Sequence, residues 1–172
     1  MSVKKILIEP NKLLRQVSKS VEEVGNDERI LMDDMLDTMY DAPGIGLAAV
    51  QIGVPKRIIV MDISRDENKK EPRYFVNPVI KNKNDEKAKY EEGCLSVPNQ
   101  FAEIERPNEC EIEYLDYDGK KKLLRADGLL ATCIQHEMDH LEGILFIDYL
   151  SKLKKSMIIK KLSKIKVSRE IF

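Results

Sequence analysis

Residues 135–140 read Gln-His-Glu-Met-Asp-His, and the expected fold is built around this stretch. Side chains four residues apart lie one above the other on a helix, so His136 and His140 can bind the same metal ion, with Glu137 beside it. These two histidines are the only ones in the chain. The alternative, an exposed helix with two unrelated histidines, explains this spacing only by chance.

A helix is predicted from about Asp127 to about Gly143, because aspartate is a favoured N-cap residue and glycine often follows the last turn. A helical wheel gives this helix three sides. The first has Leu129, Cys133, His136 and His140, the second has Leu130, Ile134, Met138 and Leu141, and the third has Thr132, Gln135, Asp139 and Glu142. We therefore expect one side to carry the metal site, one to face the core and one to be polar.

The rest of the chain predicts an α+β fold. A long N-terminal helix is expected from Asn26, as its N-cap, to Pro43-Gly44. Its apolar residues at helical spacing are Ile30, Leu31, Met35, Leu36 and Met39. Strands are expected at 57–63, 74–80 and 110–117, a hairpin turn at Asp118-Gly119, and a C-terminal helix at 151–167. Mixed or antiparallel strands would then pack around the central metal-binding helix.

Length and composition limit the class of protein. A chain of 172 residues that is 42% apolar is expected to form a single domain over residues 1–172. Its three cysteines are an odd number, which argues against a disulfide scaffold and for a reducing compartment. The first residues contain no apolar run long enough for a signal peptide or a membrane span. We therefore expect a cytoplasmic monomer without membrane contact.

The third metal ligand must come from outside the histidine motif, because a catalytic metal of this kind usually takes three protein ligands and no other histidine exists. Cys133 would sit about 7 Å along the helix axis from the midpoint of the two histidines, too far for a short thiol. Cys110 lies in a predicted strand, where core packing is expected. Cys94, which follows Gly93, is the best remaining candidate, and the carboxylate of Glu92 stays an alternative.

Three separated segments resemble the three motifs of the peptide deformylase family. They are Gly-Ile-Gly-Leu-Ala-Ala-Val-Gln at 44–51, Glu-Gly-Cys-Leu-Ser at 92–96, and the motif at 135–140, in the family's order. The resemblance implies a metal-dependent hydrolase that removes the formyl group from the N-terminal formylmethionine of newly synthesised proteins and releases formate. Its partners would be N-formylmethionyl nascent peptides.

The resemblance also implies roles for individual residues in catalysis and metal binding. Cys94, His136 and His140 would bind the metal, Glu137 would be the general acid and base, and Gln51 with the backbone N–H of Leu95 would stabilise the oxyanion. Chemistry alone favours Zn²⁺ for one cysteine and two histidines, whereas many family members resemble Fe²⁺ enzymes that lose activity on oxidation. One divalent ion, Fe²⁺ or Zn²⁺, is therefore expected.

A second group of residues would bind the substrate. The glycines Gly44 and Gly46 would let the substrate backbone come close. Together with the helical wheel, the resemblance suggests that the methionine pocket is lined by Ile45, Tyr90, Leu129 and Cys133, for which ordinary core packing is the alternative.

Two positions outside the motifs bear on the expected site. Asp139 is expected to pair with Arg106 and so fix the metal-binding strand against the helix, with a plain surface ion pair as the alternative. Many bacterial relatives have a basic residue where this chain has Phe101. The family's contacts to the peptide beyond methionine are therefore not carried over to this chain.

Other functions share parts of these patterns. A zinc endopeptidase uses the same histidine helix, but a cysteine as third ligand disfavours it. A structural metal or RNA-binding module would need a closed four-ligand site, and no fourth ligand is evident. Gly44-x-Gly46-x-x-Ala49 also fits a dinucleotide fingerprint, but a helix rather than a strand precedes the glycines.

The C-terminal segment is strongly basic. From Ser151 onward, eight lysines and arginines stand against Glu170 alone and alternate with apolar residues. We expect an amphipathic helix that contacts ribosomal RNA near the exit of the nascent chain, as in relatives with a similar C-terminal helix. A helix that only docks on the rest of the protein is the alternative.

Overall fold

The computed structural model describes residues 2–64 and 66–170, with the side chains of 166–170 excepted. Three α-helices and seven strands make up the described chain, with short 3₁₀ helices between them. In chain order these elements are α1 (Asn26–Asp41), β1 (Gly46–Ala48), β2 (Ile58–Met61), β3 (Arg73–Lys83), β4 (Lys87–Cys94), β5 (Val97–Pro107), β6 (Glu109–Leu115), β7 (Lys121–Asp127), α2 (Gly128–Leu141) and α3 (Lys152–Glu170). The 3₁₀ helices are Lys12–Arg15, Ala49–Ile52 and Phe146–Tyr149.

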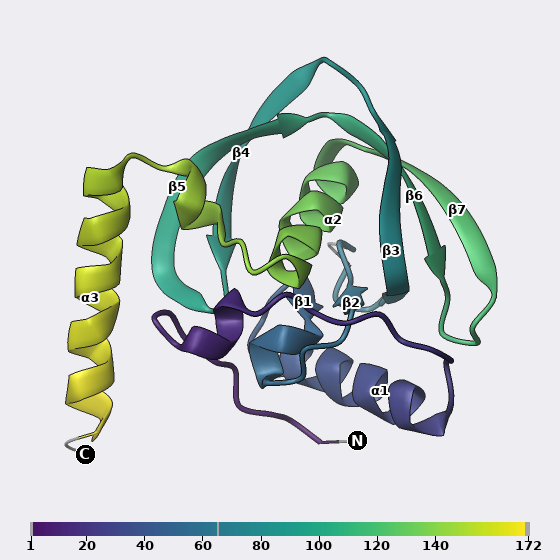
Figure 1. Cartoon of the computed structure of the whole chain (residues 1–172), viewed down its shortest axis with the longest axis horizontal. Coiled ribbons are helices and arrows are strands. Elements are labelled where there is room, and N and C mark those ends of the chain that lie inside the picture. Colours follow the sequence, from purple (N-terminus) through teal and green to yellow (C-terminus); the bar gives the residue numbers. More distant parts are fainter. Residues whose placement is uncertain (1, 65, 171–172) are drawn as a thin grey trace.

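The strands form two antiparallel sheets around α2. Five strands lie in the order β1-β2-β3-β6-β7, and β4 pairs with β5 in a separate hairpin. Figure 1 shows α2 within the curve of these strands, with β4 and β5 on one side and β3, β6 and β7 on the other. The predicted α+β class, with strands around a central helix, is therefore confirmed.

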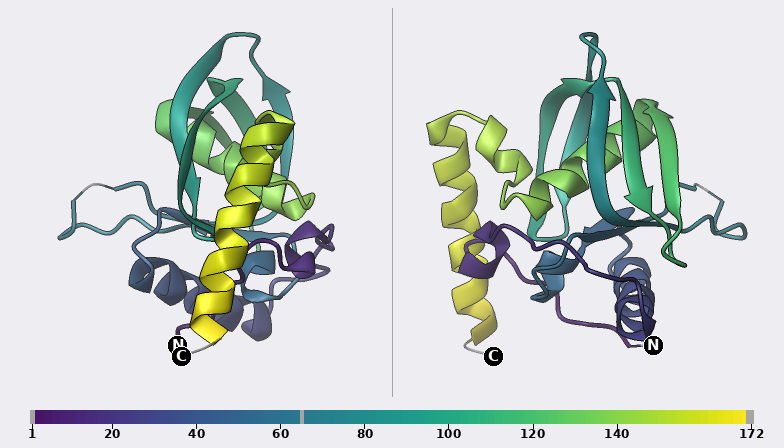
Figure 2. Two further views of the ribbon diagram at one scale, coloured as in Figure 1. Left: turned by 90° about the vertical axis from the view of Figure 1, so that its left-hand side faces the viewer. Right: turned by 45° about the vertical axis from the view of Figure 1, so that its right-hand side comes forward.

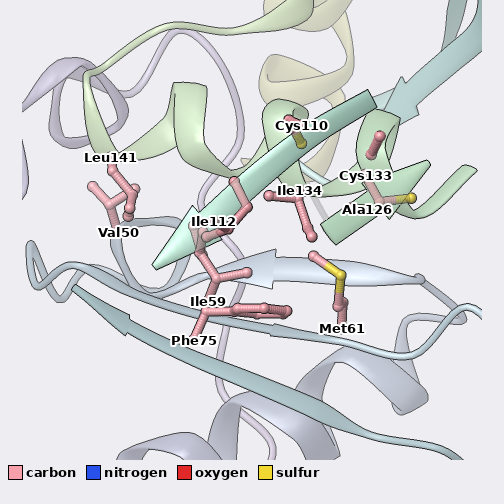
Figure 3. Packing of buried hydrophobic residues seen from close by; sticks show 12 residues of the cluster. Val50, Ile59, Met61, Phe75, Cys110, Ile112, Ala126, Cys133, Ile134 and Leu141 are labelled. Atoms are coloured by element: carbon pink, nitrogen blue, oxygen red, sulfur yellow. The ribbon is translucent and has the colours of Figure 1, made fainter. Parts of the chain in front are cut away.

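The side of α2 that was predicted to face the core does so. Ile134 and Leu141 are fully buried, and they belong to one cluster with Ile59, Phe75 and Ile112 of the five-stranded sheet (Figure 3). Complete burial of an aliphatic or aromatic side chain of this size contributes about 1.5–3 kcal/mol. This packing fixes the helix, and with it the orientation of its histidines, on the sheet.

The prediction of a polar side on α2 is partly wrong. Thr132 and Gln135 are buried. The amide of Gln135 donates hydrogen bonds of 2.8 Å to the carbonyl of Pro107 and 3.1 Å to that of Ala131. The end of β5 therefore covers this side of the helix, and the covering strand supplies the acceptor that a buried amide needs.

The boundaries of α1 and α2 agree with the predictions to within two residues. Asp127 is the N-cap of α2, as predicted, whereas α1 begins at Asn26 and its N-cap is Gly25. The carboxylate of Glu28 accepts the Gly25 N–H at 3.1 Å, which gives this end its cap. Ile30 was predicted to belong to the apolar face of α1, but it is exposed.

Four strands of the described chain lie outside the three predicted ranges: the short strand β1 and the strands β4, β5 and β7. In β4, β5 and β7, exposed positions carry charged residues that pair across the hairpins, which hides the alternating pattern of a strand. Lys121 of β7 lies 3.1 Å from Glu113 of β6, and Lys89 of β4 lies 4.0 Å from Glu103 of β5. The turn predicted at Asp118-Gly119 is confirmed, and Gly119 has a φ of 83° that favours glycine.

The C-terminal helix α3 lies at the edge of the molecule beside β5 (Figure 2). Its buried residues Ile158 and Leu162 join a cluster with Leu145, Phe146 and Ile147. The predicted basic residues Lys166 and Arg169 fall among the side chains that are not described. No helix in the described part of the chain is both long enough and apolar enough to cross a membrane.

Candidate metal centre and active site

Cys94, His136 and His140 meet at one point. Cys94 ends β4, and both histidines project from α2. One ligand atom from each residue lies within 4.8 Å of the other two, and Cys94 Sγ lies 3.4 Å from His140 Nε2. The chain therefore gathers the thiol and the two imidazoles that sequence reasoning selected.

The charges around this group fit a cation. Burial and the neighbouring His136 lower the pKa of His140 well below its usual value, so His140 stays neutral, as a metal ligand must. Burial also lowers the pKa of His136, but hydrogen bonds with Cys94 and Glu92 raise it well above its usual value. A site that favours positive charge on an imidazole also suits a divalent ion, and the thiol and imidazole donors suit such an ion.

Glu137 lies beside the group and is buried. Its Oε1 is 4.0 Å from His136 Nε2, and among the described residues Oε2 has no hydrogen-bond partner. Burial, with a smaller contribution from Glu92, raises the pKa of Glu137 to about 7. A carboxyl group with this pKa can both take up and release a proton near neutral pH.

Gly46 of β1 makes room for this carboxylate. A Cβ atom at Gly46 would lie 2.6 Å from Glu137 Oε1, which is closer than real Cβ contacts come. Any larger residue at this position would push the carboxylate away from the histidines. The first motif therefore touches the third one directly.

A buried network of side chains fixes the ring of His136 through its Nδ1 atom. Glu92 Oε1 lies 2.9 Å from His136 Nδ1, which leaves Nε2 free to face the centre. Arg106 donates to both oxygens of Glu92, at 2.7 and 2.9 Å, and to Asp139 at 2.8 Å. The predicted pair between Asp139 and Arg106 is therefore present, and the hydroxyl of Tyr149 donates to Asp139 from outside at 2.8 Å.

Glu92 links Arg106 to the histidine, a role that sequence reasoning did not assign to it. The alternative of Glu92 as a metal ligand does not fit, because its oxygens bind Arg106 and His136. One signal was available: Glu92 and Cys94 are two residues apart, so in a strand they share a face.

Gln51 is oriented by its neighbours. Its Oε1 accepts the Ala48 N–H at 2.9 Å, so its amide nitrogen must point the other way. This Nε2 lies 3.0 Å from Ser96 Oγ and 3.5 Å from Cys94 Sγ. Gln51 therefore presents a donor next to the candidate ligand Cys94. Ser96 was not predicted, and only its position two residues after Cys94 could have suggested it.

A cavity of about 480 Å³ opens onto the group. All six residues predicted to bind substrate line it, namely Gly44, Ile45, Gly46, Tyr90, Leu129 and Cys133. Gln51, Cys94, Leu95, His136 and Glu137 also line it. Burial raises the pKa of Cys133 to about 12, so this thiol stays protonated and adds no charge to the cavity wall.

Comparisons with known proteins agree with this geometry. A family model described as polypeptide deformylase matches residues 3–156. The chain is 86% identical over 171 residues to a peptide deformylase of Pelagibacter ubique, with 99% of each chain covered. A crystal structure of peptide deformylase from Ehrlichia chaffeensis matches with a TM-score of 0.93 and 43% identity, over 98% of this chain and 99% of that one. The same bacterium's enzyme in complex with actinonin matches with a TM-score of 0.90 and 46% identity, over 95% and 98% of the two chains.

Proposed function

The chain belongs to the peptide deformylase family, and on this premise we propose how its residues remove the formyl group from N-terminal formylmethionine and release formate. The enzyme acts on formylated nascent peptides and carries a site for a divalent metal. The zinc-endopeptidase alternative is set aside, because the family match is to deformylases.

Cys94, His136 and His140 would hold the metal, and Glu92 would fix the ring of His136 through its Nδ1. A divalent ion bound there would supply Lewis acidity toward water and toward the formyl carbonyl. We propose Fe²⁺ or Zn²⁺, and metal analysis of protein purified without oxygen decides between them. The thiol of Cys94 suits either ion and is the donor that oxidation would remove.

Glu137 moves the proton. Its pKa of about 7 suits a group that takes a proton from the attacking water and then gives it to the leaving amine. Its burial beside His136 supports this role. General acid and base catalysis of this kind contributes about 10²–10⁴ in rate.

Gln51 and Leu95 would hold the oxyanion that develops on the formyl oxygen. The Gln51 amide is already aimed at the centre by Ala48, so it needs no reorganisation during the reaction. The backbone N–H of Leu95, directly after Cys94, would be the second donor. Removal of one such donor typically costs about 3 kcal/mol of transition-state stabilisation.

The methionine side chain would enter the cavity between Ile45, Tyr90, Leu129 and Cys133. The glycines Gly44 and Gly46 would let the substrate backbone run close to this wall. Both are positions where a Cβ would collide, at 2.6 Å, with the side chain of Leu95 or of Glu137. Space at the centre is therefore limited, which favours the small formyl group over larger acyl groups.

The single observation that carries this proposal is the buried Glu137, with its Oε1 4.0 Å from His136 Nε2, beside a converging Cys-His-His group. The test measures formate release from formyl-Met-Ala-Ser by anaerobically purified protein, with its metal content determined. We expect Glu137→Gln to keep the metal and lose about 10³ in kcat. Glu142→Gln, a matched change at the exposed end of the same helix, should leave kcat unchanged. Absence of release by metal-loaded wild type, or an unaffected Glu137→Gln variant, would contradict the proposal.

We further propose that α3 contacts ribosomal RNA. The exposed lysines Lys152, Lys154, Lys160, Lys161 and Lys164 support this, because phosphates attract such a basic face. The buried residues Ile158 and Leu162 dock the helix on the protein, so docking and RNA contact would use different faces. Truncation after Leu150 should weaken ribosome binding in a co-sedimentation assay, and unchanged binding would remove this part of the proposal.

The chain is proposed to act as one domain, as a monomer and in the cytoplasm, where nascent chains are made. The packing of α2 against both sheets supports one cooperative unit. A single unfolding transition and a monomeric mass in analytical ultracentrifugation are the expected results.

A further inference from the structure

Phe101 is an exposed aromatic side chain at the mouth of the cavity. It lies on β5, lines the cavity and is 66% exposed. Ile45, from the segment before β1, lines the same cavity and is 47% exposed. Two large apolar side chains from different parts of the chain therefore remain open to solvent at one opening.

The Phe101 ring lies close to the segment that contributes Cys94 to the candidate metal site. It lies against Gly93, where an added Cβ would come within 2.6 Å of the ring. Gly93 directly precedes Cys94, and consecutive Cα atoms are about 3.8 Å apart. The ring therefore lies at the cavity, beside the chain segment that carries Cys94.

The charged residues that line the cavity also indicate which peptides would bind at its opening. Within the described residues, the cavity is lined by no lysine or arginine, and its charged members are Glu91, Glu92 and Glu137. Glu92 is neutralised by Arg106, whereas Glu91 is exposed. The opening is therefore apolar on its surface and negative in charge, which suits a bulky apolar side chain and repels a carboxylate.

We propose that Phe101, which lines the same cavity as Ile45, is a specificity-determining residue for the peptide beyond methionine. It favours substrates with a bulky apolar residue in the second or third position and disfavours acidic ones there. This inference rests on the deformylase mechanism proposed above and deepens it.

Two peptide series test the proposal, formyl-Met-X-Ser-amide and formyl-Met-Ala-X-amide, with X as leucine, serine or aspartate. C-terminal amides are used because a free carboxylate would itself be repelled at the opening. In at least one series, wild type should prefer leucine to serine by about tenfold in kcat/KM, mainly through KM, since about 1.4 kcal/mol of apolar contact gives a factor of ten. Phe101→Ala should reduce this preference to within about twofold and leave kcat unchanged.

Control variants separate specificity from folding. Leu123→Ala removes a side chain of similar exposure, 60%, on β7 and should keep the wild-type preference. Phe101→Leu should keep most of it, because an apolar surface remains. Lack of preference in both series for wild type, or an equal loss for all peptides in Phe101→Ala, would overturn the proposal. Formate release from the serine peptides, measured in the same assay, reports on the proposed function independently.

Discussion

The helices α2, of 14 residues, and α3, of 19 residues, differ in what surrounds them. In α2, the side chains of both apolar and polar residues are buried, including His136, Glu137 and His140. In α3, buried Ile158 and Leu162 hold the helix, while lysines, Leu153 and Met157 are exposed. A polar group on α2 therefore acts through fixed partners, whereas a polar group on α3 acts mainly through water. Substitutions of polar residues should therefore have large, site-specific effects around α2 and small effects around α3, whereas the buried apolar residues of α3 should matter for stability. Four experiments test this difference.

The largest effect is expected for a proposed metal ligand on α2. His140→Ala removes one of the three converging donors, and its metal content should fall to a small fraction of the wild-type value. Formate release should fall by about 10³-fold or more, because the Lewis acid is lost with the ion. Lys160→Ala on α3 should change neither quantity. Retention of wild-type metal content by His140→Ala, measured by atomic emission, would show that the comparison between the helices is wrong.

The second largest effect is expected for a substitution of Arg106, because this residue holds α2 against β4 and β5. Arg106→Met takes away the cation that pairs with both Glu92 and Asp139, in a site where the Arg106 side chain is 6% exposed. Removal of one member of such a buried group costs about 3–5 kcal/mol in the free energy of unfolding, measured by urea denaturation. Metal affinity should fall by about 10–100-fold, because His136 loses its fixed orientation.

Lys121→Met provides the control for Arg106. The Lys121 side chain is 72% exposed in its pair with Glu113, and such surface pairs contribute about 1 kcal/mol or less. Similar losses of stability in Arg106→Met and Lys121→Met would mean that the buried network does not hold the centre.

Sequence patterns predicted the features of the fold and site that depend on residues close together in the chain. The ends of α2, its core stripe and the pairing of its histidines follow from spacing and caps within one helix. Cys94 followed from the exclusion of two other thiols and agreed with the motif resemblance. The link from Arg106 to Glu92 and His136 could not be predicted in this way, since it depends on β4 pairing with β5 and on both lying against α2. The burial of Gln135 depends on the same long-range packing.

The next experiment compares two leucines of α3. Leu162 is fully buried and Leu153 is 72% exposed, so the same substitution tests burial within one helix. Leu162→Ala should lower the free energy of unfolding by about 2–4 kcal/mol, because it opens a cavity against Leu145 and Phe146. Leu153→Ala should change it by about 0.5 kcal/mol or less. Both variants should keep wild-type kcat, and a loss of kcat in Leu162→Ala would show that α3 supports the active site.

The smallest effect concerns the ion pairs that tie α3 to the rest of the protein. Asp148 lies 2.6 Å from Arg15 and 2.7 Å from Lys155 of α3. Burial raises the pKa of Asp148, but the hydrogen bonds from Arg15 and Lys155 outweigh it and leave the pKa below its usual value. A lowered pKa in the folded state means that the stabilisation is complete above the unfolded value near 4 and is lost as the pH falls through the folded value.

Wild type should therefore be more stable than Asp148→Asn at pH 6, by about 0.5–1 kcal/mol for a partly exposed group, and the difference should vanish as the pH falls below about 4. Urea unfolding of both proteins between pH 6 and 3 measures this. A difference that grows toward low pH would mean that burial, not the cations, controls this carboxylate. In that case α3 would be held mainly by apolar residues such as Ile158 and Leu162, and its polar groups would be even more independent of the fold than the comparison with α2 predicts.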